Sequence, residues 1–450
     1  MAAKKRGAFS RRDFIKAAGA GALAAGVGPA IIIPGRSYAA KKTLKILQWV
    51  HFVPPYDEWF NKTYIKEWGE KNDTEVSVDN IGIGLLPARA AAEVGAQKGH
   101  DLFLFMSPPA AYEDQVIDHA EIYQECRRKY GDPLDLAIKS TYNPKTKKYF
   151  AFSDSYVPDP ANYRKDLFDA IGMTKGPDTW DDIRVGGRKI KQQFGNPVGI
   201  GLSQELDTSM AMRAIMYSFG SSEQDRDGNV VINSKQTLEA VKFVKALYEE
   251  TMTDEVFSWD PSSNNRAMLA GKLSVALNAI SITRTAEKEN PEMSKKIMVI
   301  KTAKGPVRRI GLEHVMDCYA IWKFAENQEG AKKFLVDYIG NFKKGFLASE
   351  FYNFPCFPKT VPDLQKIIAN DPKAHPPDKY KVLGDVLDWA TNVGYPGYSN
   401  AAIDEIFNTW VIPNMFAKAA KGVLSPEDAI KEAETACKRI FAKWKEKGLV

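Results

Sequence analysis

Lys45-Ile46-Leu47-Gln48-Trp49-Val50 is a short apolar run that predicts a first strand, and the sixty residues that begin with it decide the fold. Apolar residues then recur at helical spacing over 56–71 and alternate with polar residues over 75–81. An Ala-rich stretch over 86–98 predicts a second helix that stops at the following glycine. Asp101-Leu102-Phe103-Leu104-Phe105 predicts a buried strand. The order strand, helix, strand, helix, strand predicts an α/β fold with parallel strands and crossover helices.

The rest of the chain predicts a second unit of the same kind. The proline-containing segment 155–160 is typical of a crossing between units, and 198–202 predicts a strand beyond it. A strand over 315–324 returns late in the sequence. The last hundred residues are mainly helical in pattern, most clearly over 401–420 and 425–447. We therefore expect two α/β units joined by crossing strands, followed by a helical C-terminal region.

The N-terminus carries a predicted export signal. Ser10-Arg11-Arg12-Asp13-Phe14-Ile15-Lys16 is a twin-arginine motif, 17–33 is weakly apolar, and Ser37-Tyr38-Ala39 offers small residues at a cleavage site. Cleavage is expected after Ala39 or Ala40. The apolar run is shorter than the roughly 20 residues that a membrane span requires. The signal predicts passage through the twin-arginine translocase in the folded state, and a periplasmic location.

The net charge of the mature protein is close to zero. The whole chain carries +6, and the segment up to Ala39 contains seven basic residues and one acidic residue. The signal peptide thus accounts for the basic balance. The remaining charge gives no indication of binding to nucleic acid or to an anionic membrane surface.

Motifs for catalysis, metals and cofactors are lacking in the sequence. We find no G-x-S-x-G, no P-loop, no G-x-G-x-x-G and no pair of histidines at ligand spacing, so we expect neither an enzyme nor a cofactor nor a metal site. The four cysteines, Cys126, Cys318, Cys356 and Cys437, are widely spaced. Cys318 and Cys356 are the pair to test for a disulfide, and isolated buried thiols are the alternative.

Several short motifs, in order along the chain, resemble a known family. Ala161–Phe168 is similar to its Tyr-Asn-x-Asp-Leu-Phe stretch, with Arg164 in place of the usual Asn. Pro177–Asp182 is similar to its Pro-x-Thr-Trp-Asp-Glu helix start, and Met268–Leu277 to its Gly-Lys-x-Ala-Met strand. Ala320–Leu335 is similar to its Ala-x-x-Phe-Leu helix. Together these motifs resemble the sugar-type extracellular solute-binding proteins of ABC importers, family 1.

This resemblance implies a fold and a way of working. The fold would be a two-lobed periplasmic-binding-protein fold, type II-like, behind the signal peptide over 1–39. One lobe would combine 40–154 with 311–355, and the other 155–310 with 356–450. The ligand would be a small-molecule solute, with a sugar favoured, bound between the lobes. Hinge closure would then present a monomeric receptor to the transmembrane subunits of an ABC permease.

Candidate ligand-binding residues follow from the chemistry of sugars and from the strand ends. Sugar rings stack on aromatic side chains, polar side chains satisfy the hydroxyls, and in α/β sheets such groups gather past the carboxyl ends of strands. Candidates after predicted strands are Trp49, His51, Phe52, Ser107, Asn278 and Ser281. Candidates at the crossings are Tyr156, Asp159, Glu313 and His314. Aromatic candidates in loops are Trp259, Tyr352, Tyr395 and Tyr398. Tryptophans with apolar periodicity are assigned to packing: Trp59, Trp68, Trp180, Trp322, Trp410 and Trp444.

Three functions remain open at this point. The first is a receptor for a mono- or oligosaccharide. The second keeps the fold but binds a polyamine, an amino-acid derivative or another small organic solute, for which Glu313, Asp159 and Asp207 would supply carboxylates. The third is an exported cofactor-dependent enzyme, because twin-arginine export often serves such enzymes.

Overall fold

The computed structural model describes residues 42–450, which form one compact unit. The predicted signal peptide over 1–39 lies outside the described residues. The described strands form a seven-stranded sheet, a four-stranded sheet and a two-stranded ribbon. No helix within residues 42–450 is long and apolar enough to cross a membrane.

The first sheet contains the predicted parallel strands. It consists of β1 (Lys42–Trp49), β2 (Thr74–Ile81), β3 (Leu102–Phe105), β6 (Phe152–Pro158), β11 (Gly311–Ile321), β12 (Phe354–Pro355) and β13 (Ala390–Thr391). The order is β12, β6, β11, β3, β1, β2, with β13 beside β11. β1 is parallel to β2 and β3, which confirms the prediction, and β11 is antiparallel to β3 and β6.

Helices connect these strands. The crossovers between the parallel strands are α2 (Pro54–Trp59), the π-helical turn η1 (Phe60–Tyr64) and α3 (Ile65–Lys71), then η2 (Ile83–Leu85) and α4 (Leu86–Ala96). Between β3 and β6 come η3 (Ala110–Gln115), α5 (Ala120–Tyr130), α6 (Asp135–Thr141) and the ribbon of β4 (Tyr142–Asn143) and β5 (Lys148–Tyr149). After β11 come α14 (Gln328–Gly340) and α15 (Phe342–Ala348).

Helix α4 ends earlier than the glycine rule predicts. Gln97 adopts the left-handed conformation, with φ 49°, and its side chain donates to the carbonyl of Val94 at 2.8 Å. Gly99 has another role, because a Cβ there would lie 2.3 Å from the carboxylate of Glu93. The glycine lets that buried carboxylate approach the backbone, where it accepts from the N–H of His100.

The second sheet is smaller. It consists of β7 (Ala161–Arg164), β8 (Val198–Gly199), β9 (Val275–Leu277) and β10 (Ile297–Ile300), in the order β10, β7, β9, β8. Around it lie α7 (Lys165–Ala170), α8 (Trp180–Phe194), α9 (Leu206–Ser218), α10 (Lys235–Thr251), η4 (Asp254–Ser258), α11 (Ser263–Leu269), α12 (Ser281–Glu289) and α13 (Pro291–Ser294). Thr179 begins α8 with a capping box that Asp182 completes. β8 confirms the strand predicted over 198–202, although it covers only Val198–Gly199.

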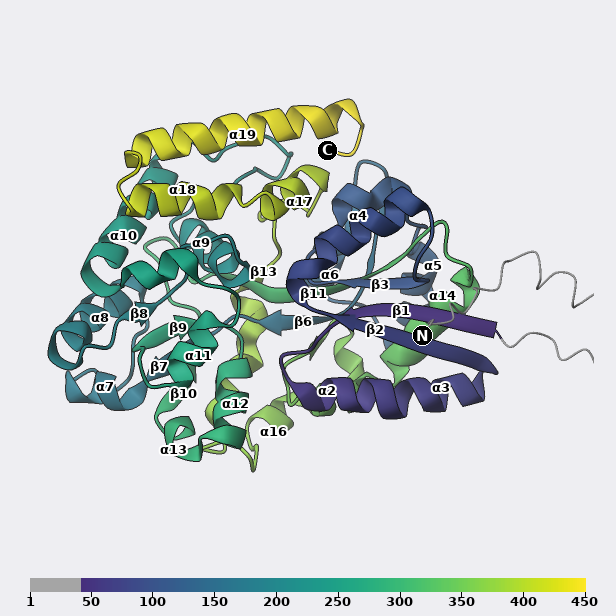
Figure 1. The fold of residues 1–450 in the computed structure, drawn as a ribbon, viewed down its shortest axis with the longest axis horizontal. Coiled ribbons are helices and arrows are strands. Elements are labelled where there is room, and N and C mark those ends of the chain that lie inside the picture. The colour runs from purple at the N-terminus through teal and green to yellow at the C-terminus, as the bar shows by residue number, and fades with distance from the viewer. Residues whose placement is uncertain (1–41) are drawn as a thin grey trace, which may run out of the picture. The chain divides into compact units, whose positions relative to one another are not determined.

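The chain crosses between the sheets at two places. It leaves the first sheet at the end of β6 and enters the second at β7, so Asp159 and Pro160 form the crossing. It returns from β10 to β11, which begins at Gly311, four residues before the predicted strand. β6 and β11 are adjacent, and they run through the middle of the view in Figure 1. The fold is thus two-lobed, while the lobe boundaries at 154/155, 310/311 and 355/356 stay a prediction.

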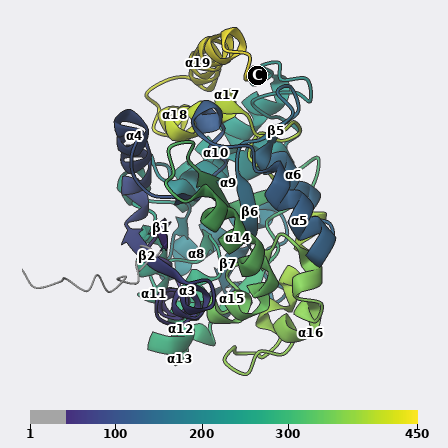
Figure 2. The same ribbon diagram turned by 90° about the vertical axis from the view of Figure 1, so that its right-hand side faces the viewer.

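The C-terminal region is helical, as predicted. It contains η5 (Pro358–Thr360), α16 (Leu364–Ile368), η6 (Lys379–Asp388), α17 (Ala401–Asn408), α18 (Val411–Ala420) and α19 (Pro426–Glu446). Helices α18 and α19 pack on α10, whereas α17 packs on η3, which follows the first sheet. Figures 1 and 2 both show α17, α18 and α19 gathered at the top of the view. The helix predicted over 401–420 is interrupted at Thr409 and Trp410, which separate α17 from α18.

Candidate functional site

A pocket of about 410 Å³ lies where the two lobes and the C-terminal helices meet. Its walls come from the segment after β2 (Ile83–Pro87), the end of β3 with the loop that follows (Phe105–Tyr112), and the start of α9 (Gln204–Leu206). α17, the start of α18 and Trp444 of α19 complete it. Two walls thus lie past the carboxyl ends of parallel strands, where α/β proteins bind ligands.

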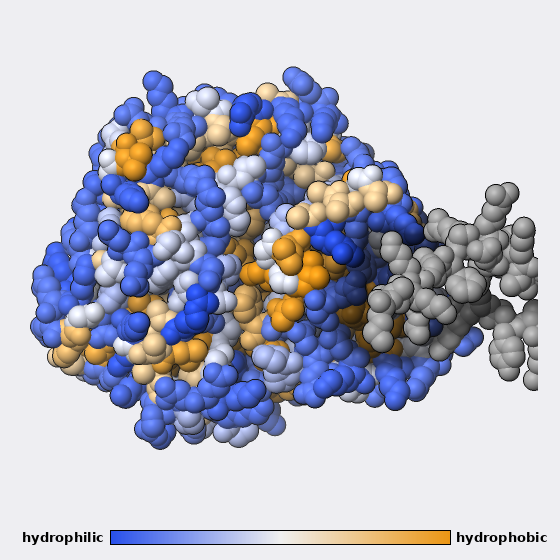
Figure 3. All heavy atoms as spheres, viewed as in Figure 1, coloured by the Kyte–Doolittle hydropathy of each residue, from blue (hydrophilic) through white to orange (hydrophobic). Residues whose placement is uncertain are grey.

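The pocket is lined by aromatic and aliphatic side chains. The aromatic residues are Phe105, Tyr112, Phe407, Trp410 and Trp444. Hydrophobic side chains also gather on the surface over the N-terminal end of α4 (Figure 3), where Leu85 is 61% exposed. Ring faces and aliphatic walls suit a ligand that presents apolar faces.

Trp410 has an unusual backbone. Its φ is 60°, in the left-handed region, and it precedes the first residue of α18. This conformation is disfavoured for a bulky residue and persists only where the surroundings hold it. The break between α17 and α18 turns the indole ring of Trp410 toward the pocket.

Three carboxylates line the pocket, and each is held in place. Glu205 caps α9 and accepts from the backbone N–H of Asp207 at 2.6 Å. Asp404 accepts from the backbone N–H of Ala111 at 2.8 Å. Glu405 accepts from the indole N–H of Trp444 at 2.6 Å and pairs with Lys443 at 2.6 Å. Burial raises the pKa of Glu205, and it raises the pKa of Asp404 to about 7.

A buried ion pair supports the aromatic wall from behind. Arg213 on α9 pairs with Glu223 at 2.5 Å, and both side chains are fully buried. The guanidinium carbon of Arg213 lies 5.1 Å from the ring centre of Phe407. Glu223 also accepts from the hydroxyl of Tyr217 at 2.8 Å. This arrangement fixes Phe407, so the ring wall is preorganised.

A second cluster of polar side chains lies at the crossing between the lobes. One of its members, Asp207, is two residues from Glu205 in the chain. His314 contacts Asp159 through Nδ1 at 3.1 Å and Asp207 through Nε2 at 3.4 Å. Asn278 donates to Asp207 at 2.9 Å. Burial alone would lower the pKa of His314, but the charge of Asp207 and the hydrogen bond to Asp159 outweigh it and raise the pKa to about 9. The imidazole is therefore charged at neutral pH, and these predicted residues form one network.

Ser281 and Glu313 belong to the surroundings of this network. Ser281 accepts from Asn265 at 3.0 Å, and Asn265 in turn accepts from Asn278 at 2.7 Å. Glu313 accepts from the backbone N–H of Val393 at 3.0 Å, and burial raises its pKa to about 8. Both residues are buried, so they support the crossing from inside the protein.

The predicted residues after β1 form an aromatic cluster in the first lobe. Trp49 stacks on His51 with ring centres 4.7 Å apart, and its indole N–H donates to Asp317 at 3.1 Å. The ring centre of Tyr352 lies 5.0 Å from that of His51 and 6.4 Å from that of Phe52. Burial lowers the pKa of His51 to about 4, which keeps it neutral. Trp49 is only 2% exposed, so most of its ring is committed to packing.

Tyr352 connects the cluster after β1 with the network at the crossing. Its hydroxyl is buried and has no hydrogen-bond partner among the described residues. Burial raises its pKa well above the usual range, and the charges of Asp207, Asp317 and Asp159 add to this. The hydroxyl therefore lies within electrostatic reach of both groups.

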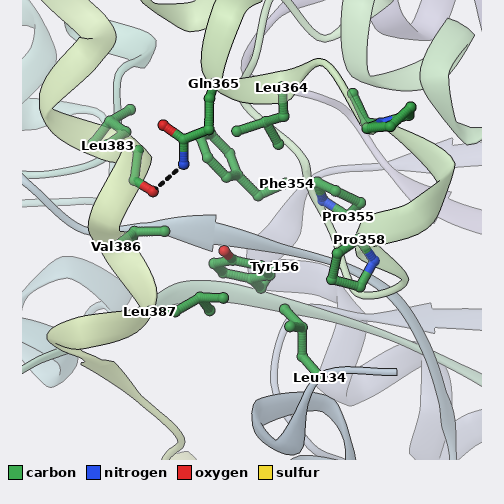
Figure 4. Close-up of a pocket in the computed structure, with 13 residues that line it drawn as sticks. Leu134, Tyr156, Phe354, Pro355, Pro358, Leu364, Gln365, Leu383, Val386 and Leu387 are labelled. Carbon is green, nitrogen blue, oxygen red and sulfur yellow. Dashed lines mark hydrogen bonds between the residues drawn. The ribbon is translucent and has the colours of Figure 1, made fainter. Parts of the chain in front are cut away.

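Tyr156 lies elsewhere. It lines a separate cavity of about 230 Å³ between the edge of the first sheet and the segment 358–387. Figure 4 shows its ring among Leu134, Phe354 and Leu387, with Gln365 donating to the carbonyl of Gly384 near the rim. This cavity is walled mainly by apolar side chains and is distinct from the pocket between the lobes.

The remaining predicted aromatics are half-buried in loops. The carbonyl of Trp259 accepts from the hydroxyl of Ser203 at 2.7 Å, and its ring packs on core side chains. Tyr395 accepts from Arg308 and packs on Tyr217, with ring centres 5.4 Å apart. Tyr398 packs on Tyr142. None of these three lines the pocket between the lobes in the described structure.

Among the residues that the structure describes, Ser107 is the one predicted site residue that lines the pocket. Phe407, Trp410 and Trp444 line it too, although helical periodicity favoured packing for both tryptophans. One sequence signal marks the break that places Trp410. Pro413 lies at the third position of α18, and proline is favoured in the first turn of a helix, so a helix start near 411 was indicated.

The four cysteines are buried and free, and Cys318 and Cys356 are not joined. Burial raises the pKa of both thiols well above the usual range. No group of three or more His, Cys, Asp or Glu side chains within the described part of the chain is arranged to hold a metal ion.

Two α/β lobes with a pocket between them define a two-lobed binding protein. Solved structures share this fold. A tagatose-bound solute-binding protein of an ABC transporter from Thermotoga lettingae superposes with a TM-score of 0.73 at 18% identity, over 89% of this chain and 100% of that one. The maltose-bound MalE3 of T. maritima gives 0.73 at 18% identity, over 88% and 99%.

The family follows from the sequence match. The model for bacterial extracellular solute-binding proteins matches residues 54–349, and the chain belongs to this family. Putative binding proteins of Brucella abortus and Brucella suis are 27% identical over 175 residues, which is 38% of this chain. The match spans 42% of the length of these curated relatives.

Proposed function

We propose that the protein is the substrate-binding receptor of an ABC importer and that it binds a mono- or oligosaccharide in the pocket between its lobes. The observation that carries the proposal is the aromatic pocket past the ends of β2 and β3, faced by α9 and α17. Its rings offer stacking surfaces, and Ser107, Asn408 and the carboxylates offer hydrogen bonds to hydroxyls. The sugar ligands of the structural neighbours from Thermotoga lettingae and T. maritima also support it.

The family relationship supports the partners and the location. We propose that the chain is exported by the twin-arginine translocase, acts as a monomer in the periplasm, and delivers its solute to the transmembrane subunits of a permease. Two segments join the lobes, one between β6 and β7 and the other between β10 and β11. Lobes of this kind close by a hinge motion at such segments. The description of the family names solute binding, and we propose binding, rather than catalysis, as the role of this chain.

Thermal unfolding of the protein against sugars, polyols, polyamines and amino acids tests the ligand class. A ligand at 100 times its dissociation constant adds about 2.7 kcal/mol of stability, which shifts the melting temperature measurably. Stabilisation by one class of sugars supports the proposal. Stabilisation only by polyamines or amino acids would keep the fold and overturn the sugar assignment.

A pair of variants locates the site. Trp410→Ala removes a pocket ring and should abolish the shift given by the ligand. Trp59 of α2 is half-buried, packs on Tyr56 and Tyr64, and is not among the residues that line the pocket. The control variant Trp59→Ala should therefore keep the shift. If both variants keep the shift, the ligand binds outside this pocket.

A further inference from the structure

The charged side chains that line the pocket are all acidic. Glu205, Asp404 and Glu405 line it, and no Lys, Arg or His does so among the described residues. Two cations next to lining residues stand outside its walls. Lys443 pairs with Glu405, while Arg213 lies behind Phe407 and is paired with Glu223.

Two of the carboxylates have no cation paired with them. Glu205 accepts from backbone N–H groups of α9 and from the hydroxyl of Thr208, and Asp404 accepts from the backbone of Ala111 and the amide of Asn408. These donors fix the orientation of the carboxylates but bring no full positive charge. A carboxylate can accept about four hydrogen bonds, so each retains capacity for a ligand. Burial raises the pKa of both groups, and a bound cation would favour their charged forms, so the pocket holds oriented carboxyl groups that suit a cationic ligand.

The groups near this wall are mainly acidic as well. Asp207 lies two residues from Glu205 in the chain, and His314 contacts both Asp207 and Asp159 at the crossing. Acidic groups thus outnumber basic ones on this side of the pocket.

The aromatic wall also suits a cation. Rings attract positive charge over their faces, and each of two pocket rings already has a cation over it. Arg213 lies 5.1 Å from the centre of Phe407, and Lys443 lies 4.8 Å from that of Trp444. Trp410 presents a further ring to the pocket. Within residues 42–450, no cation lies over that ring.

We propose that the solute is a saccharide that carries a protonated amino group, and that Glu205 and Asp404 select the ammonium while the aromatic wall packs on the ring. This proposal rests on the proposed receptor function and narrows its substrate class. A neutral sugar would leave the two oriented carboxylates without a cation, and an anionic sugar would meet repulsion from them. A linear polyamine would leave the ring faces without a planar partner.

Matched sugar pairs test the proposal. Isothermal titration of the full-length chain would compare glucosamine with glucose, galactosamine with galactose, and the disaccharide of glucosamine with cellobiose, at low salt. We expect the amino member of at least one pair to bind at least tenfold more tightly, which corresponds to about 1.4 kcal/mol. The preference should shrink as salt screens the charges.

Variants assign the preference to the pocket. Asp404→Asn keeps an acceptor for Ala111 but removes the charge, and should lower the preference several-fold with little change for neutral sugars. Glu205→Gln is a second variant of the same kind, because it keeps an acceptor for the backbone of α9 and removes the charge. Glu427→Gln is the control, because this exposed residue of α19 pairs only with Lys242 and lies outside the pocket.

The outcomes separate the two proposals. Equal or tighter binding of the neutral members would overturn the amino-sugar proposal and leave the sugar receptor intact. Binding of polyamines without binding of any sugar would overturn both. A preference that survives Asp404→Asn and Glu205→Gln together would place the selection elsewhere and overturn the role assigned to this pocket.

Discussion

The carboxylate of Asp404 accepts a hydrogen bond from the backbone N–H of Ala111 at 2.8 Å, and this contact joins α17 to η3 beside the pocket. The two residues are nearly three hundred positions apart in the chain. Asp404 also accepts from Asn408 at 2.5 Å, one turn further along the same helix. The bond fixes the C-terminal wall of the pocket against the loop that follows β3.

Replacing Asp404 by Ala should destabilise the protein. The change leaves the N–H of Ala111 without its acceptor, which costs about 1–3 kcal/mol for a desolvated donor. Urea unfolding followed by circular dichroism would measure the loss. Asp132→Ala is the control, since Asp132 is 82% exposed and its pair with Arg127 contributes at most about 1 kcal/mol. Equal stability of the two variants would show that the contact between α17 and η3 contributes nothing.

The free energy of unfolding should fall as the pH rises from 6.5 to 9. The pKa of His314 is raised to about 9 in the folded protein, so its stabilising contribution is present below about 6.5 and is lost as the pH passes 9. The pKa of Glu313 is raised to about 8, so the folded state again holds the proton more tightly, and stability again falls with pH. Each group contributes a slope of at most about 1.4 kcal/mol per pH unit.

Urea unfolding at a series of pH values measures this slope, and the double variant His314→Asn with Glu313→Gln should flatten it. Proton NMR of His314 should show a titration well above pH 8. A midpoint near 6.5 would contradict the charged network of His314, Asp159 and Asp207.

Trp49→Ala should lower stability strongly. The side chain of Trp49 is buried, stacks on His51 and donates to Asp317, so its removal leaves a cavity that costs about 3–5 kcal/mol. Trp410→Ala, by contrast, should cost much less stability and act mainly on ligand affinity, because Trp410 is half-buried at the pocket. Thermal unfolding of both variants without ligand tests the contrast. A larger loss in Trp410→Ala would reverse the roles assigned to the two rings.

The four thiols should be unreactive in the native protein. All are buried and free, and burial raises their pKa values, so thiolate is scarce at neutral pH. A thiol reagent such as Ellman's should label almost none of them within minutes in buffer, and all four in guanidinium chloride without reductant. Only two labelled thiols under denaturing conditions would indicate a disulfide.

The polar candidates at the crossing show how far local patterns reach. Asp159, Asn278 and His314 were chosen because each lies at the end or the start of a strand, and the structure does bring them into one network. The network is buried, however, and none of its members lines the pocket among the described residues. Strand ends can be predicted from sequence, but whether a side chain at such an end faces solvent or the interior depends on the lobe that packs against it.

The tryptophans show the opposite case. Trp410 and Trp444 lie in apolar helical patterns, and such patterns predict packing correctly for most residues. They line the pocket because α17 and α18 are separated by a left-handed residue and because α19 packs along both. No local signal gives the direction in which these three helices present their rings.

The sequence by itself determined the α/β class, the parallel order of the first three strands and the return strand, because strand and helix periodicity are properties of short segments. The tertiary structure decided which residues surround the pocket. That choice depends on contacts between segments hundreds of residues apart, such as Asp404 with Ala111 and Arg213 with Phe407. These contacts exist only once the two lobes and the C-terminal helices have packed together.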